Sequence, residues 1–186
     1  MKRVLPLLIL VLLGGCGPAT MAPWPSPDHA VMSPRLYRFR LERAGTTRFS
    51  GLLAITPLET GVRAVLLDAT GLELVRESVA PDGETAVEYA APPVRSTRLP
   101  ELLGKLVETL YFTPAAGECS WYALVAVCRA DEGTGSRTWK RLGPLHLWDL
   151  WRGGNARAAT TVRFGLSGVT VHLTPLAAVN ELEDSQ

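Results

Sequence analysis

The chain has 186 residues, and its 19 lysines and arginines almost balance its 18 aspartates and glutamates. Binding to nucleic acid depends on a basic surface that releases counterions from phosphates, so this balance argues against a nucleic-acid partner. The length suits one domain with a sizeable core and is short for two. We therefore expect a single domain, which the strand and helix patterns place at residues 31–180.

The N-terminus has the features of an export signal. Lys2 and Arg3 precede an apolar run over residues 4–13, and two glycines then lead to Cys16. The run is too short to anchor the chain across a bilayer, and small residues at its end are typical of a cleavage site. We expect residues 1–15 to be a signal peptide.

The sequence Leu13-Gly14-Gly15-Cys16 resembles the lipobox of bacterial lipoproteins. The resemblance implies that the Cys16 sulfur takes a diacylglycerol and that Cys16 becomes the new N-terminus. Gly17 occupies the position after the cysteine, where an aspartate would favour retention in the inner membrane. The resemblance therefore implies an outer-membrane anchor with the domain facing the periplasm. Several acyl chains on one residue give stable anchoring. The alternative is an ordinary secretory signal in which Cys16 is incidental.

A proline-rich segment follows the cysteine. Residues 17–27 contain four prolines, a density that disfavours helix and strand ladder alike. We expect residues 16–30 to be the lipidated cysteine and an extended tether.

Beyond residue 35 the apolar residues alternate with polar ones, a period typical of half-buried strands. Glycine-containing turns separate five such segments, which predicts an antiparallel meander with one apolar and one polar face. Glu73 and Glu77 are expected on the polar face. The expected strands contain residues 37–41, 49–55, 62–66, 72–77 and 87–89.

The period changes at residues 99–111, where leucines recur at three and four residues and Pro100 stands in the first turn. This pattern predicts an amphipathic helix. Its apolar stripe needs a surface, and the apolar face of the preceding meander is the nearest candidate.

The C-terminal part returns to strand patterns. A hairpin is expected to pair residues 121–129 with 137–142, and another to pair 162–166 with 169–173. Residues 145–151 are compatible with either a strand or a short helix. The acidic tail at residues 181–186 is expected to be flexible.

Cys119 and Cys128 pose an open question. An oxidising periplasm favours a disulfide between them. The intervening residues contain no turn signal and are compatible with one continuous strand, which would hold the two Cα atoms roughly 30 Å apart, whereas a bridge needs less than about 7 Å. A disulfide is therefore possible only if the strand is broken.

The sequence offers little support for catalysis. No serine has the flanking glycines of a hydrolase elbow, and the usual zinc-binding spacings are absent. His146 lies near Asp149, but a structural contact is favoured over a catalytic one, and His172 fits a solvated strand position. We expect no enzymatic activity, no metal and no cofactor.

The lipobox, the meander opened by residues 48–55 and the helix after the fifth strand together resemble the LolA/LolB family of lipoprotein carriers. The resemblance implies a mainly β (α+β) fold, a curved antiparallel sheet or half-barrel of about nine to eleven strands covered by an amphipathic helix.

In such a fold, apolar residues of the sheet and helix would line a hollow for an acyl chain. The sequence-based candidates for this ligand site are Phe49, Leu53, Ile55, Leu103, Trp121 and Trp139. We expect an outer-membrane lipoprotein that binds an acyl-bearing or other apolar ligand, or a lipoprotein, for delivery or assembly. The alternative is a structural or assembly lipoprotein with no cavity, whose sheet edge recruits an envelope protein.

Overall fold

The computed structural model describes residues 34–113, 119–122, 124–155 and 158–176. The predicted signal peptide at 1–15, the lipid attachment site Cys16, the tether at 16–30 and the tail at 181–186 lie outside these residues. Those four predictions are therefore not addressed by the structure.

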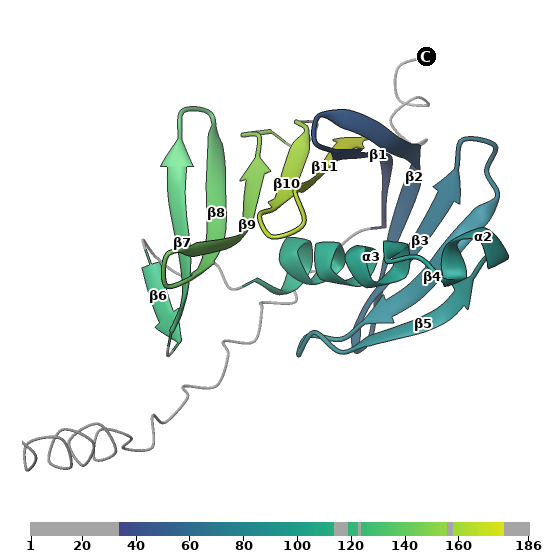
Figure 1. Ribbon diagram of the computed structural model, residues 1–186, viewed down its shortest axis with the longest axis horizontal. Helices are drawn as coiled ribbons and strands as arrows, with labels where there is room; N and C mark the ends of the chain where they lie inside the picture. Colours follow the sequence, from purple (N-terminus) through teal and green to yellow (C-terminus); the bar gives the residue numbers. More distant parts are fainter. Residues whose placement is uncertain (1–33, 114–118, 123, 156–157, 177–186) are drawn as a thin grey trace, which may run out of the picture.

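The described residues form one eleven-stranded antiparallel sheet, with the strand order β5-β4-β3-β2-β1-β11-β10-β9-β8-β7-β6 (Figure 1). The sheet is not closed, because β5 and β6 stand at opposite ends of this order. The strands are β1 (Arg35–Arg43), β2 (Thr46–Leu58), β3 (Gly61–Asp68), β4 (Glu73–Val79), β5 (Thr85–Ala90), β6 (Cys119–Tyr122), β7 (Val125–Glu132), β8 (Gly135–Leu142), β9 (Leu145–Arg152), β10 (Thr160–Phe164) and β11 (Val169–Pro175).

The predicted mainly β architecture is confirmed. The first five strands form the expected meander, and β1 then pairs with β11, so the first and last strands lie side by side at the centre of the sheet. The ambiguous segment at 145–151 is a strand, β9, which pairs with β8 and β10. Its alternation of Leu150 toward the core and Trp151 toward solvent explains why a strand forms there.

Three helical segments follow β5, namely α2 (Pro92–Arg95), α3 (Leu99–Val107) and the π-helix η1 (Glu108–Phe112). The predicted helix is thus confirmed, with its last turn widened into a π-helix. Its apolar stripe buries Leu103, Leu106 and Val107. The helix packs against β3, β4 and β5 within the bend of the sheet (Figure 1). We call this face of the sheet the helix side and the opposite face the outer side.

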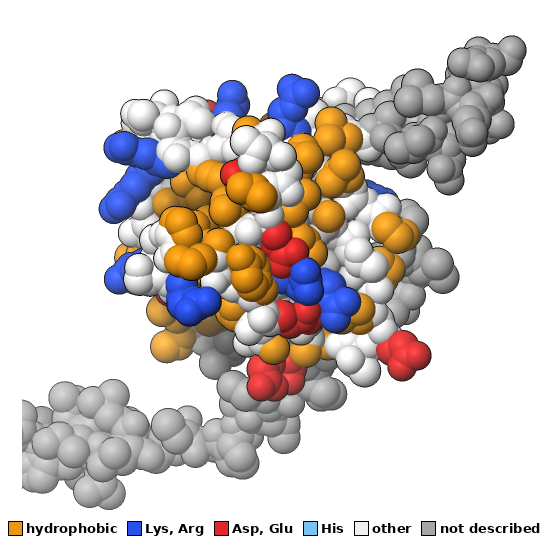
Figure 2. Space-filling view, turned by 90° about the vertical axis from the view of Figure 1, so that its right-hand side faces the viewer, with side chains coloured by type: hydrophobic (Ala, Val, Ile, Leu, Met, Phe, Trp, Pro, Cys, Tyr) orange, Lys and Arg blue, Asp and Glu red, His pale blue; other side chains and the backbone are white. Residues whose placement is uncertain are grey.

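The outer side of the first strands is less polar than predicted. Leu52, Val65 and Leu67 are half-buried on it, next to the ion pairs Arg63–Glu88 and Arg76–Glu73. Figure 2, which faces the right-hand side of Figure 1, shows hydrophobic side chains gathered among acidic and basic ones.

The prediction that Glu77 lies on the polar face with Glu73 is wrong. A β-bulge separates the pairs Leu66–Val75 and Leu67–Glu73, so one extra residue of β4 is left unmatched. Such an insertion reverses the alternation of side chains along a strand. Glu73 therefore faces outward, whereas Glu77 is fully buried on the helix side between Val75 and Val79.

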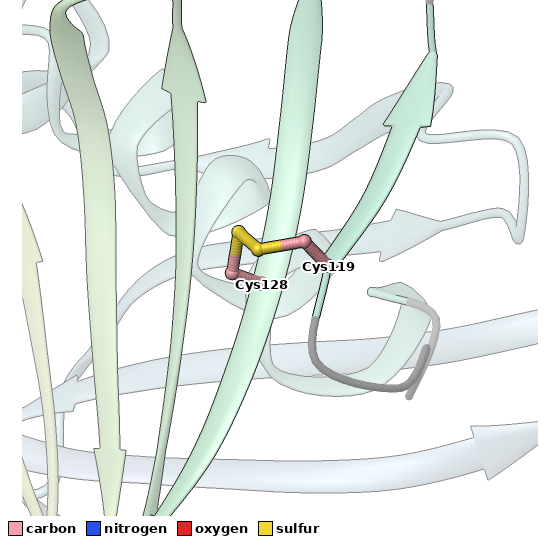
Figure 3. The surroundings of a disulfide bond; sticks show 2 residues. All are labelled: Cys119 and Cys128. Carbon is pink, nitrogen blue, oxygen red and sulfur yellow. A yellow bond between two sulfur atoms is a disulfide. The ribbon is translucent and has the colours of Figure 1, made fainter.

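The prediction of a continuous strand through residues 121–129 is also wrong. The chain reverses between β6 and β7, with an exposed Leu124 at the turn, and the two strands pair antiparallel. This register puts Cys119 directly opposite Cys128, with their Cα atoms 4.0 Å apart. The two cysteines form a disulfide that joins β6 to β7 (Figure 3).

Candidate functional site

Four of the predicted ligand-binding residues lie together on the helix side. Leu53 and Ile55 of β2 and Leu103 of α3 are fully buried in one hydrophobic cluster. Phe49 is half-buried at its margin, and its ring meets that of Phe39 edge-on with centroids 5.7 Å apart. The sequence pattern thus identified residues that share one space between sheet and helix.

Trp121 and Trp139 do not join these four residues. Trp139 is paired with Asp149. The neighbouring pair on the same two strands is Thr138 with Leu150, and Leu150 is buried in the core. Because neighbouring side chains in a strand point to opposite faces, Trp139 lies on the outer side. Trp121 belongs to the same outer face and is 58% exposed. Neither ring lies on the face that carries the hollow proposed from the sequence.

Trp148, one of the C-terminal tryptophans that the sequence made candidates for the core or for a cavity wall, does lie on this face. It is paired with Phe164 and packs against the hydrophobic cluster. From the sequence, residues 145–151 were compatible with either a strand or a helix. In a strand, Trp148 and Trp151 point to opposite faces, because neighbouring side chains alternate.

A cavity of about 230 Å³ opens on the helix side where α3 gives way to η1. We call it the end pocket. Leu110 of η1 and Leu173 of β11 contribute to its apolar wall, and Tyr37 and Tyr111 also line it. π-Helical turns often occur at functional sites, because the widened turn redirects side chains that a regular helix would align differently. Here the widened turn supplies both Leu110 and Tyr111 to the pocket.

The polar groups of the end pocket are cationic and phenolic. The Tyr37 and Tyr111 hydroxyl oxygens lie 3.2 Å apart, and burial raises the pKa of Tyr111 well above its usual range. Arg152 donates a hydrogen bond to the Leu110 carbonyl, and burial lowers its pKa. A hydrogen bond with Tyr37 raises the pKa of Arg35, which also lines the pocket.

Arg152 forms no ion pair with a carboxylate among the described residues. A largely buried guanidinium without an acidic partner is costly, because its solvation by water is only partly replaced. The end pocket therefore combines an apolar wall with two guanidinium groups, an arrangement suited to an amphiphile whose polar end is anionic.

Glu77 is a second unusual group on the helix side. Both of its carboxylate oxygens are buried and have no hydrogen-bond partner among the described residues. This burial raises the pKa of Glu77 to about 8. At neutral pH the side chain is therefore mostly protonated, and the core beneath α3 carries little net charge from it.

Among the described residues, no group of three or more His, Cys, Asp and Glu side chains could hold a metal ion. His146 Nδ1 lies 3.7 Å from Asp149 Oδ2, and Asp149 also accepts hydrogen bonds from Arg137. His172, expected at a solvated strand position, is partly exposed and lies 3.3 Å from Glu42 across β1 and β11.

No helix within the described part of the chain is long and apolar enough to cross a membrane.

No protein-family model matches the chain, and no curated protein matches it at a significant level. The resemblance to lipoprotein carriers accordingly remains a prediction from the sequence and its pattern.

Proposed function

We propose that the protein is an outer-membrane lipoprotein anchored through Cys16, whose curved sheet forms a half-barrel under the small helix α3. In this proposal the helix side binds an acyl-bearing or other apolar ligand for delivery to, or assembly in, the outer membrane. The lipobox at residues 13–16 supports the anchor. The open antiparallel sheet with one amphipathic helix in its bend is consistent with the half-barrel.

The end pocket is the observation that carries the proposal. An acyl chain would lie along Leu110 and Leu173, and its anionic end would meet Arg35 and Arg152. Burying ten methylenes stabilises a complex by about 8 kcal/mol before the costs of ordering are subtracted.

Ligand sites usually have volumes of about 300–1,000 Å³, so a pocket of 230 Å³ takes only part of a long chain. Admission of the rest requires α3 and η1 to move away from the sheet.

The alternative function, an assembly lipoprotein without a ligand, is favoured by a different observation. Leu53, Ile55 and Leu103 are already fully buried, so the core beneath α3 needs no ligand to cover it. The edge strands β5 and β6 could then recruit a partner through added strand pairing.

An environment-sensitive fatty-acid probe distinguishes the two functions. We expect saturable, micromolar binding to a chain that begins at residue 30, and a weakened complex in Arg152→Gln, whose shorter neutral side chain cannot pair with a carboxylate. Arg38→Gln, an exposed arginine on the outer side of β1, is the matched control. Absence of binding to the parent chain would leave the assembly function as the better account.

The anchor is tested separately. Cys16→Ser should leave an unprocessed or soluble protein in place of a membrane-bound one, because the sulfur that accepts the lipid is missing. Cell fractionation and mass spectrometry of the N-terminal peptide measure this result. A variant that is still lipid-modified and still found in the outer membrane would contradict the anchor at Cys16.

A further inference from the structure

The outer side of β6–β11 carries large aromatic side chains in contact with solvent. Trp121 is 58% exposed and Trp151 is 45% exposed. Large aromatic groups exposed on one face of a monomeric protein are uncommon and can mark an interaction surface. This face lies opposite the end pocket, so a ligand site on it is independent of the proposed function.

The strand register arranges these residues in two neighbouring rows. Directly opposite residues of paired strands point to the same face. One row consists of Trp139, Asp149, Arg163 and Thr170, and the next of Arg137, Trp151, Thr161 and His172. Aromatic, cationic and hydroxyl groups therefore alternate across four strands.

Arginines stack on two of the indole rings. The Arg141 guanidinium carbon lies 5.3 Å from the centroid of Trp121, and that of Arg137 lies 5.4 Å from the centroid of Trp139. Such contacts hold both the ring and the guanidinium in fixed orientations. On the same face, the disulfide between Cys119 and Cys128 joins β6, the strand that carries Trp121, to the neighbouring strand β7.

A cavity of about 440 Å³ lies at the end of these rows, between the β1–β2 turn and the β10–β11 turn. We call it the outer pocket. Its walls hold Trp151, the exposed Arg163 and the hydroxyls of Thr161 and Thr170. Asp149 also faces it, where Arg137 donates hydrogen bonds of 3.1 and 2.6 Å to one carboxylate oxygen.

The rim of the outer pocket contains a strained residue. Ala44 has a φ of 51°, a left-handed conformation that alanine rarely adopts. Ala44 and Gly45 form the two-residue turn between β1 and β2, which requires left-handed backbone at both positions. A small side chain at this position leaves the mouth of the pocket open.

We propose that the outer pocket and the adjoining rows of tryptophan and arginine bind an anionic saccharide. The flat indole of Trp151 suits the C–H face of a sugar ring, and Arg163 suits a carboxylate or phosphate substituent. Asp149, Thr161 and Thr170 can hydrogen-bond ring hydroxyls. An apolar ligand does not fit a wall that holds Arg137, Asp149 and Arg163.

The test measures binding to the full chain purified in a non-ionic detergent. Tetragalacturonate and a phosphorylated maltotetraose carry the two kinds of anionic group, and maltotetraose is the neutral control. Titrations followed by tryptophan fluorescence and calorimetry should show saturable binding of at least one anionic sugar. Maltotetraose should bind at least tenfold more weakly, because it has no group for Arg163. The tighter binder of the two anionic sugars shows whether the pocket prefers a carboxylate or a phosphate substituent.

Two variants locate the site. Arg163→Gln and Trp151→Ala should each weaken binding of that sugar at least tenfold, whereas the matched variants Arg38→Gln and Trp148→Phe should leave it within twofold. Circular dichroism checks that each variant is folded. Binding of neither anionic sugar, or binding that Arg163→Gln leaves unchanged, would overturn the proposal. Tighter binding of a tetraglutamate peptide or a tetrathymidylate would also overturn it, in favour of an acidic protein or a nucleic acid.

Discussion

The two halves of the sheet both bury residues on the helix side, such as Leu53 and Leu150, but they differ in where their largest apolar side chains point. In the half that α3 covers, β2 to β4 point Leu53, Leu66 and Val75 toward the helix and bury them completely. In the other half, β6 to β9 point Trp121, Trp139 and Trp151 away from the helix side. An apolar residue in a strand is therefore not necessarily part of the core. A cover on one face decides which alternate residues are buried.

The largest expected effect concerns Glu77, the buried acid of the covered half. Folded Glu77 keeps its proton up to about pH 8, whereas the unfolded side chain loses it near 4.5. Between these values the folded state binds more protons, so the free energy of unfolding should fall as the pH rises. The slope is about 1.4 kcal/mol per pH unit, which amounts to several kcal/mol over the whole window.

Chemical denaturation at pH 5, 6, 7 and 8 measures this slope. Glu77→Gln should remove it, because the amide does not titrate, and the exposed Glu59→Gln should retain it. Equal slopes in the parent chain and in Glu77→Gln would show that Glu77 is not the buried acid.

The second prediction compares one leucine from each half. Leu103→Ala should lower the free energy of unfolding by about 2–5 kcal/mol, since it leaves a cavity between α3 and the sheet. Leu145→Ala, at a position that is 52% exposed in β9, should change it by less than about 0.5 kcal/mol. A small loss for Leu103→Ala would instead indicate that α3 covers a collapsible hollow.

The smallest expected effect concerns the disulfide of the uncovered half. Replacing both cysteines with alanine should lower the free energy of unfolding by roughly 2–3 kcal/mol, because the bridge closes a short loop between residues nine apart. Thermal unfolding with and without reductant measures the change. If reduction lowers the melting temperature of the double alanine variant as much as that of the parent, the effect is not due to this bridge.

The sequence predicted the covered half well, apart from the face of Glu77, and the uncovered half less well. The alternation through Tyr37, Phe39 and Leu53 and the spacing of Leu103 and Leu106 define faces directly, because burial under α3 imposes the period. The bulge beside Leu74 places Glu77 on the face opposite to the predicted one, and no glycine or proline in β4 indicates this bulge.

The turn between β6 and β7 was also not predicted, because no glycine or proline marks it. Without that turn, the sequence could not place Cys119 opposite Cys128. The tryptophans were interpreted as lining residues because their size favours burial. Arg137 and Arg141, which flank Trp139 at alternate positions, were the available signal that this ring shares an outward, charged face.

In the proposed function, an acyl ligand enters the helix side at the end pocket and does not bind the outer tryptophans. Photo-crosslinking in cells that express the full chain tests it most directly, with a fatty acid that carries a diazirine near the end of its tail. Mass spectrometry should locate the adducts on Leu110, Tyr111 or Leu173, which line the end pocket. Adducts confined to Trp121 and Trp151, or none above the level of an unrelated periplasmic protein, would contradict the claim.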